Sequence, residues 1–392
     1  MLKSIAQLFS LHIIVKLIGL ATIGIVLEFL SIENFGKYSF YILFLHLIAI
    51  IVDPFLAAYL VEYKIFDYKK YNGGIFFLSL ILIPFFYLAL FLFNLNIEIK
   101  VFLLFCSTFL LSGLLKSFLN VREEFFKYGL IDVFRQSAIL LSTIFYFFYF
   151  DRIDFLSLLE VNYFVTSIIL LLCIPFFIKK TEIFFDTRKS TYIKLIENSK
   201  YLIFYTAIIP ILSFIDSYFV DKFLNEKDLG LYSFSLKVYN ISLMLVIPIF
   251  TVLNIKQIKI AKAENYLSFL NKNFKKVLFF SLSFFILFLL INTIITQYIY
   301  TSYSDTFLPT SILLIGSFIA YLTIPFSFLI AYRKYRHLFS IAILAILINI
   351  TLNFLLIEKY GILIAAISTA LSQIIINLGA ALVSYFLLKK RV

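Results

Sequence analysis

Residues 35–40 read Phe-Gly-Lys-Tyr-Ser-Phe, and residues 229–234 read Leu-Gly-Leu-Tyr-Ser-Phe. The two segments lie 194 positions apart, and at the same offset Pro54 corresponds to Pro248. Because the two prolines match at the same offset as the two segments, we interpret the similarity as an internal duplication rather than a chance match. The duplication predicts that the chain contains two structurally equivalent halves.

The composition around these segments is typical of a membrane protein. Hydrophobic residues make up 62% of the 392 residues and charged residues only 14%, whereas a soluble domain has roughly 45–50% and 25%. With 11 Gly and 7 Pro, the chain does not have the composition of a disordered sequence. Its two cysteines, Cys106 and Cys173, lie within apolar runs, so we expect neither a disulfide framework nor a metal site.

Twelve apolar runs in the sequence are long enough to cross a bilayer, which takes about 20 residues of helix. They predict an all-α polytopic membrane protein with twelve transmembrane helices. The runs are 5–30, 37–60, 74–96, 101–120, 129–150, 156–178, 201–224, 231–253, 277–298, 309–332, 338–357 and 361–387.

The distribution of basic residues predicts the orientation of these helices. Of the 34 Lys and Arg, 24 lie at the two termini or in the connections on the same side, and 6 lie in the connections on the opposite side. The side that is richer in Lys and Arg is normally cytoplasmic, so both termini are predicted to be cytoplasmic. The net charge of +12 is then explained by contact with anionic lipids, and we expect no nucleic-acid partner.

The two copies of the repeated segment are six predicted helices apart, so the halves share the same orientation. Such a parallel repeat predicts two pseudo-symmetric six-helix bundles, with substrate bound between them. We expect an N-terminal bundle over residues 1–178 and a C-terminal bundle over 201–392. Between them, residues 179–200 form a basic, partly amphipathic linker that is predicted to lie on the cytoplasmic leaflet.

Four cations within the apolar runs are candidates for binding an anionic substrate: Lys16, Lys237, Lys116 and Arg135. Lys16 lies near the bilayer midplane, where it cannot easily reach either surface and would attract a diphosphate or an acidic sugar. The alternative for each cation is a structural ion pair with an acid of the same or a neighbouring helix. For Arg135 that acid is Asp132, three residues earlier.

Two acids in the runs, Asp53 and Asp216, are candidates for coupling transport to Na⁺ or H⁺. Asp53 precedes Pro54, where a bent helix can leave backbone carbonyls available to an ion. Each acid has the alternative of pairing with Lys16 or Lys237. No other cofactor is expected.

Three motifs resemble the multidrug/oligosaccharidyl-lipid/polysaccharide exporter (MOP) superfamily, and within it the polysaccharide flippases of the Wzx type. The first is the Gly-x-Tyr-Ser turn at 36–39 with Asp53 beyond it, and the second is its counterpart at 228–233 with Asp216 and Asp221 before it. The third covers 349–369. It consists of an Asn-x-x-Leu-Asn helix at 349–353, a Gly-Ile turn at 361–362 and the pair Ala365-Ala366. In this last motif Leu363-Ile364 stand where the family commonly has a Gly.

This resemblance implies a V-shaped pair of bundles that rock around a central basic cavity. It implies a flippase that moves an undecaprenyl-diphosphate-linked oligosaccharide to the outer leaflet of the bacterial cytoplasmic membrane, for O-antigen or capsule synthesis and alongside a polysaccharide polymerase. A cation-coupled exporter of small molecules from the same superfamily is the alternative. A membrane polymerase or glycosyltransferase is disfavoured, because the sequence has 3 His, short outer loops and no Asp-x-Asp or Gly-rich phosphate motif.

Overall fold

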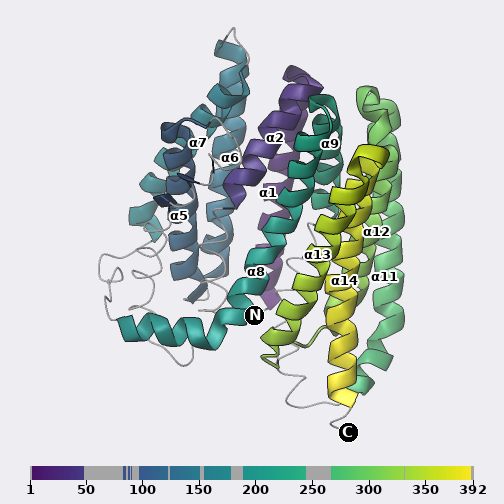
Figure 1. The fold of residues 1–392 in the computed structure, drawn as a ribbon. Coiled ribbons are helices and arrows are strands. Elements are labelled where there is room, and N and C mark those ends of the chain that lie inside the picture. The colour runs from purple at the N-terminus through teal and green to yellow at the C-terminus, as the bar shows by residue number, and fades with distance from the viewer. Residues whose placement is uncertain are drawn as a thin grey trace. The chain divides into compact units, whose positions relative to one another are not determined.

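The computed structural model describes residues 2–47, 83–84, 87–88, 90, 97–121, 124–150, 154–177, 189–243, 266–330 and 332–389. These residues are mostly helical, and none of them lies in a β-strand (Figure 1). The chain divides into two compact units, Met1–Pro210 and Ile211–Val392.

The first unit is built on two long helices, α6 and α7, that pack against each other. α6 also packs against α1 and α5, and α7 also contacts α2 and α5. The helix α8 begins in this unit and continues into the second. The bounds are Leu2–Phe29 for α1, Ile32–His46 for α2, Ile99–Val121 for α5, Phe125–Tyr149 for α6, Phe155–Phe177 for α7 and Lys189–Phe223 for α8.

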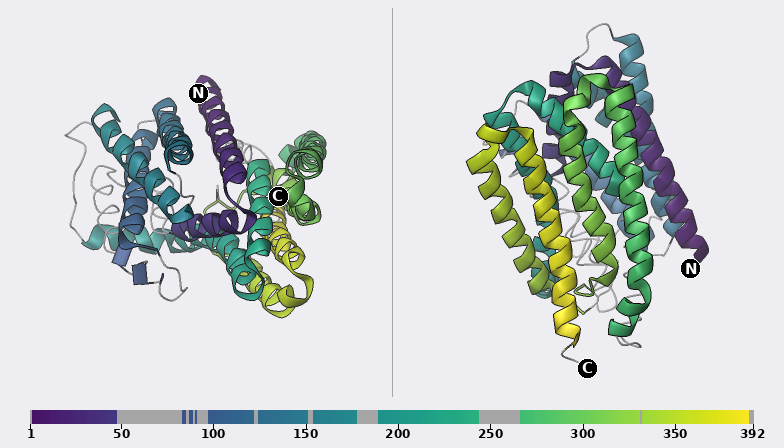
Figure 2. Two further views of the ribbon diagram at one scale, coloured as in Figure 1. Left: turned by 90° about the horizontal axis from the view of Figure 1, so that it is seen from above. Right: turned by 90° about the vertical axis from the view of Figure 1, so that its right-hand side faces the viewer.

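In the second unit α14 is the central helix and contacts α9, α11, α12 and α13. Figure 2 shows α11 to α14 side by side. A π-helix and a 3₁₀ helix lie between α11 and α12, and a 3₁₀ turn follows α12. The bounds are Glu226–Ser242 for α9, Tyr266–Ile294 for α11, Ile295–Ile299 for η3, Thr301–Thr306 for η4, Phe307–Thr323 for α12, Ile324–Phe326 for η5, Tyr335–Tyr360 for α13 and Ile362–Lys389 for α14.

Corresponding helices have corresponding neighbours in the two units. In the first unit α7 contacts α2, α5 and α6, and in the second α14 contacts α9, α12 and α13. The repeated segments also start alike, because Ser31 Oγ accepts from Asn34 N (3.3 Å) at α2 and Asn225 Oδ1 accepts from Asp228 N (2.8 Å) at α9. Each side chain caps a backbone donor that has no partner within the helix.

Eight helices of the described ranges are long and apolar enough to cross a membrane. They coincide with the first, fifth, sixth, seventh and ninth to twelfth runs that the sequence predicts. The fourth run forms α5, whose apolar part is shorter, and the second, third and eighth runs lie partly outside the described residues. The eight spans are Ser10–Phe29, Phe126–Tyr149, Phe155–Phe177, Lys200–Phe223, Asn271–Ile299, Thr301–Phe326, Tyr335–Tyr360 and Ile362–Leu387.

Several helix boundaries differ from the predicted runs, since α2 starts at Ile32 and not at 37, and α11 starts at Tyr266 and not at 277. α8 starts at Lys189, within the predicted linker, and Figure 1 shows its first turns running across the direction of its later ones. α12 ends at Thr323, whereas the predicted run continued to 332. Pro325 explains the early end of α12, because it cannot donate to a carbonyl in the preceding turn and the chain changes there to a 3₁₀ turn.

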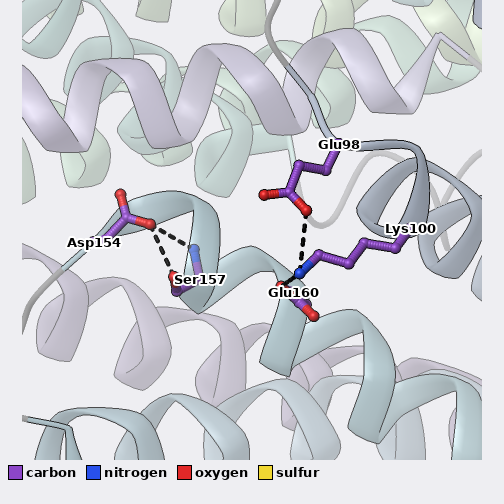
Figure 3. Close-up of polar contacts among 5 residues, drawn as sticks. All are labelled: Glu98, Lys100, Asp154, Ser157 and Glu160. Carbon is purple, nitrogen blue, oxygen red and sulfur yellow. Dashed lines mark hydrogen bonds and ion pairs between the residues drawn. The ribbon is translucent and has the colours of Figure 1, made fainter.

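The start of α7 is held by polar contacts that Figure 3 shows together with a neighbouring group of ion pairs. Asp154 Oδ2 accepts from Ser157 N and Ser157 Oγ, both at 2.9 Å, and so caps α7. Lys100 Nζ lies 3.1 Å from Glu98 Oε2 and 3.0 Å from Glu160 Oε2, which links the start of α5 to α7. These contacts therefore hold the start of α7 and join it to the start of α5.

Candidate substrate and ion sites

One candidate site lies in the first unit and consists of three cations around one carboxylate, which we call the basic cluster. Its members are Lys16 of α1, Lys116 of α5, and Asp132 and Arg135 of α6. Lys116 Nζ lies 2.6 Å from Asp132 Oδ1, and Arg135 Nη2 lies 3.4 Å from the same oxygen. Arg135 thus forms the ion pair that its spacing suggested, but the closer partner of Asp132 comes from another helix.

The packing of α1 along α6 brings Lys16 to this cluster. One turn after Lys16, the two helices approach closely, since a Cβ atom on Gly19 would lie 3.5 Å from Gln136 Nε2. Lys16 interacts electrostatically with both Arg135 and Asp132. It forms no ion pair with any residue in the described ranges, so its charge is the least compensated of the three cations.

Aromatic rings support the two paired cations from the side. Lys116 Nζ lies 5.2 Å from the centroid of the Tyr128 ring, and Arg135 Cζ lies 6.0 Å from that of Phe109. The Phe109 ring in turn meets the His46 ring edge to face, with centroids 5.3 Å apart. Contacts of this kind position a cation without neutralising it.

The cations of the basic cluster remain partly accessible. The side chains of Lys116 and Arg135 are 21% and 25% exposed, against 11% for Asp132. α5 and α6 are also fixed to α7 by an apolar core, which consists of Leu115, Leu119, Ile131, Leu170 and Phe177. An anion can therefore approach cations that are held on a rigid base.

The chemistry of the basic cluster favours an anionic ligand. Among the described residues, one carboxylate faces three cations, which leaves an excess of two positive charges. Ions at membrane depth are costly unless they are paired. Arg135 offers the planar, bidentate geometry that suits phosphate, and the two lysines offer point charges.

A second candidate site lies in the second unit around Asp216, and we call it the Asp216 cluster. The carboxylate has no solvent exposure. Its Oδ1 accepts from Asn349 Nδ2 (2.8 Å), Asn353 Nδ2 (2.6 Å) and Ser368 Oγ (2.9 Å), and its Oδ2 accepts from Thr369 Oγ1. All four donors are neutral, and no cation in the described parts of the chain pairs with Asp216.

Additional oxygen atoms surround the Asp216 carboxylate. Asn353 Oδ1 and the Tyr239 hydroxyl are buried and lack a hydrogen-bond partner within the described ranges, and Tyr239 interacts electrostatically with Asp216. The carbonyl oxygen of Ala365 also belongs to this group of oxygen atoms, because it accepts hydrogen bonds from the Tyr232 hydroxyl (3.4 Å) and from Ser368 Oγ (2.9 Å). A buried carboxylate among neutral oxygen ligands is suited to a small hard cation or to a proton.

The first unit contains a similar polar cluster without a carboxylate. Asn162 Oδ1 accepts from Ser142 Oγ (2.7 Å) and Thr143 Oγ1 (3.2 Å), and the hydroxyl of Tyr38 lies close to the Asn162 side chain. Thr22 is also buried and donates to the backbone oxygen of Ile18 on its own helix (2.9 Å).

These two polar clusters occupy the same positions along their helices. The equivalent pairs are Tyr38 and Tyr232, each the seventh residue of α2 and α9, Thr143 and Asn353, each the nineteenth of α6 and α13, and Asn162 and Thr369, each the eighth of α7 and α14. At the repeat offset of 194, Asp216 corresponds to Thr22. The duplicated cluster is therefore charged in the second unit alone.

The structure brings three of the predicted site residues together, namely Lys16, Lys116 and Arg135. Lys237 is half-buried on α9 in the second unit, and Asp53 lies outside the described residues.

The partners of Asp216 were not predicted as site residues. A signal for them is present in the sequence, because Asn349 and Asn353 are polar residues four apart in an otherwise apolar run and so share a helix face. Asp132 had been considered as a partner of Arg135, and its contact with Lys116 requires the packing of α5 against α6.

The sequence matches the family of polysaccharide biosynthesis proteins over residues 1–254. The chain belongs to this family. No curated protein sequence matches it.

Solved structures with the same fold cover almost the whole chain. One is the lipid II flippase MurJ in an inward closed conformation, with 16% identity, a TM-score of 0.72, and coverage of 99% of this chain and 92% of that one. A multidrug resistance MATE family transporter of the MOP superfamily, inward-facing, has 11% identity, a TM-score of 0.62, and coverage of 98% and 94%. A MOP superfamily transporter from Pyrococcus furiosus has 11% identity, a TM-score of 0.61, and coverage of 99% and 96%.

At these identities the similarity concerns the fold. The protein is a multi-pass membrane protein with the fold of the MOP superfamily, as the sequence motifs predicted. The structures of this fold named above are a flippase and transporters, and the family is one of polysaccharide biosynthesis.

Proposed function

We propose that the protein is a flippase that moves an undecaprenyl-diphosphate-linked oligosaccharide from the inner to the outer leaflet of the cytoplasmic membrane. The observation that carries this proposal is the basic cluster, in which Lys16, Lys116 and Arg135 outnumber Asp132. A diphosphate supplies the two negative charges that the cluster lacks, and oxygen atoms that Arg and Lys bind well. Membership of a polysaccharide biosynthesis family and the likeness to a lipid II flippase support a lipid-linked cargo.

The proposed transport cycle uses two six-helix bundles, residues 1–178 and 201–392, joined by the basic segment 179–200. Both termini are cytoplasmic, and the bundles form a V around a central cavity that opens alternately to each side. The matching neighbours of α7 and α14 support two equivalent bundles, and the excess of Lys and Arg on one side supports the orientation. Lys237 is proposed as a further substrate contact.

The Asp216 cluster is proposed as the site that couples this cycle to a cation gradient. Its ligand set fits Na⁺, because carboxylate, hydroxyl and carbonyl oxygens surround one point, and the amides of Asn349 and Asn353 can rotate to present oxygen. A proton on Asp216 would neutralise the same charge. When bound, the cation compensates a buried carboxylate that otherwise has neutral donors alone, so loading and unloading would bias the conformation of the second unit. Asp53 remains a proposed second coupling residue.

The proposed setting is the inner membrane of a bacterium, where the cargo is an O-antigen or capsule precursor. A polymerase that consumes the flipped oligosaccharide is the proposed protein partner, and the protein itself catalyses no reaction. The polysaccharide biosynthesis family supports this setting.

The test is binding of a purified lipid-linked oligosaccharide to the full-length protein in lipid nanodiscs, with wild type compared with Lys16→Ala. We expect binding to weaken by about tenfold or more, the effect of losing one charge-assisted contact. Lys127→Ala is the matched control, because Lys127 is an exposed cation on α6 that pairs with Glu124 at 2.6 Å. It should bind as wild type does. Equal affinity of folded Lys16→Ala and wild type would remove Lys16 from the site, and absence of binding by wild type would refute the flippase proposal.

A second candidate function is cation-coupled export of a small molecule. The likeness to a MATE family transporter and the Asp216 cluster favour it. The same reconstituted protein distinguishes the two functions. Uptake of small organic molecules that depends on a Na⁺ or H⁺ gradient, without binding of the lipid-linked oligosaccharide, would support the exporter.

A further inference from the structure

The charge balance of the basic cluster differs from what a structural ion pair needs. A structural pair has one cation for each carboxylate, and here Asp132 faces three cations in the described part of the first unit. Uncompensated ions within a membrane protein are costly and are kept where they serve a ligand. The excess of two positive charges therefore sets the charge of the anion that completes the site.

The contacts show how this excess is distributed. Asp132 Oδ1 lies 2.6 Å from Lys116 Nζ and 3.4 Å from Arg135 Nη2, so Lys116 is the cation that Asp132 mainly neutralises. The Arg135 guanidinium is a quarter exposed, and Lys16 has no ion pair within the described ranges. Most of the excess charge thus lies on Lys16 and on Arg135, whose contact with Asp132 is the longer of the two.

We propose that Asp132 determines specificity by lowering the preference of the basic cluster for anions with three negative charges over anions with two. This inference rests on the proposed function. A glycan-loaded carrier is a diphosphate diester, and each of its phosphates carries one charge. The bare carrier diphosphate ends in a terminal phosphate that is doubly ionised at pH 8, because the second ionisation of a phosphate monoester lies near pH 6. Asp132 therefore reduces the electrostatic advantage that the bare carrier has over the loaded carrier.

The sign of the effect follows from Coulomb's law. Removing the negative charge of Asp132 favours both anions, but it favours the anion with three charges by one additional unit of interaction. At a separation of roughly 10 Å and an effective dielectric constant of about 20, one unit of interaction changes binding by about tenfold. The contribution of the glycan is the same in every variant, so it cancels when the affinity ratio of the two carriers is compared between variants.

The experiment measures binding of both carriers to full-length protein in nanodiscs at pH 8, with polyprenyl diphosphate and its oligosaccharide-loaded form as the two probes. In Asp132→Asn, the affinity ratio should shift by about tenfold toward the bare carrier relative to wild type. Asp132→Glu keeps the charge and should retain the wild-type ratio. Lys116→Gln removes one positive charge, keeps the contact between Asp132 and Arg135, and should shift the ratio about tenfold in the opposite direction.

A double variant protects the test against misfolding of Asp132→Asn, which leaves Lys116 without its closest partner. Lys116→Gln with Asp132→Asn restores the excess of two charges, and its ratio should equal that of wild type. A merely structural ion pair predicts the same ratio in every folded variant. An unchanged affinity ratio in Asp132→Asn and Lys116→Gln would overturn this inference and leave the proposed function standing. Failure of wild type to bind either carrier would overturn both the inference and the proposed function.

Discussion

Asn353 Nδ2 lies 2.6 Å from Asp216 Oδ1, although the two residues are 137 positions apart in the sequence. The contact joins α13 to α8, and Ser368 and Thr369 of α14 complete it. Three helices thus meet at one buried carboxylate. A buried carboxylate at membrane depth is costly, and a neutral residue could fill the same space, so the charge of Asp216 indicates a function. Thr22, at the corresponding position of the first unit, is such a neutral residue.

Replacing Asp216 by Asn should remove the dependence of transport on a cation gradient. The amide keeps the shape of the carboxylate but not its charge, so the ion-dependent part of the rate should fall by about tenfold or more. Flipping in proteoliposomes with imposed Na⁺ or pH gradients measures this. Asp305→Asn is the control, because Asp305 is exposed in η4. Ion dependence that survives in folded Asp216→Asn would exclude the Asp216 cluster as the coupling site.

The contact between Lys116 and Asp132 should appear as a coupling energy in a double-mutant cycle. Lys116→Met alone leaves Asp132 with the longer contact to Arg135, and we expect a loss of about 2–3 kcal/mol in the free energy of unfolding. Adding Asp132→Asn should recover most of that loss, because no unpaired carboxylate remains. Unfolding in mixed detergent micelles is measured for wild type, for each single substitution and for the double substitution. Additive effects of the two substitutions would contradict a direct pair.

Gly361, which ends α13, should not tolerate a side chain. It has φ of 59° and ψ of −147°, a conformation that residues with a Cβ atom rarely adopt. Gly361→Ala should therefore lower the free energy of unfolding by about 1–3 kcal/mol, although no atom lies within 4 Å of the added methyl group. Gly19→Ala makes the same chemical change within a regular helix, where the nearest atom is 3.5 Å away, and should be neutral or slightly stabilising. Equal effects of the two substitutions would show that backbone strain is not the cause.

The polar contacts in Figure 3 should differ in their contribution to stability. Asp154→Ala removes the cap of α7 and should cost about 1 kcal/mol. Lys100→Ala removes two ion pairs, but these are more than half exposed at Lys100 and should contribute less than about 1 kcal/mol in total. Thermal unfolding of both variants compares them. A larger loss for Lys100→Ala than for Asp154→Ala would reverse this ranking.

Local patterns in the sequence were sufficient for an all-helical membrane protein of this fold, and they named the cations that the structure brings together in the basic cluster. Apolar runs of membrane-spanning length predicted the eight spans of the described ranges, because helix length and bilayer thickness are directly related. The motifs at 36–39, 228–233 and 349–369 predicted the superfamily. The unusual depth of Lys16 and Arg135 marked them as candidates, since ions in apolar runs are rare. The predictions of twelve helices, of cytoplasmic termini, of the bundle bounds and of the roles of all the candidate site residues stay predictions.

The sequence by itself determined the elements and their candidate charges, whereas tertiary structure decided which charges meet. Membrane insertion depends on the hydrophobicity summed along each helix, and this sum can be calculated from consecutive residues of the sequence. Pairing depends on which helix faces pack together. For Lys116 the sequence left open a substrate contact or an ion pair with an unspecified acid, and the packing of α5 against α6 placed it against Asp132. For Asp216 the sequence left open ion coupling or an ion pair with Lys16 or Lys237, whereas α8, α13 and α14 surround it with neutral donors. Contacts between helices far apart in sequence arise only when the bundle is assembled.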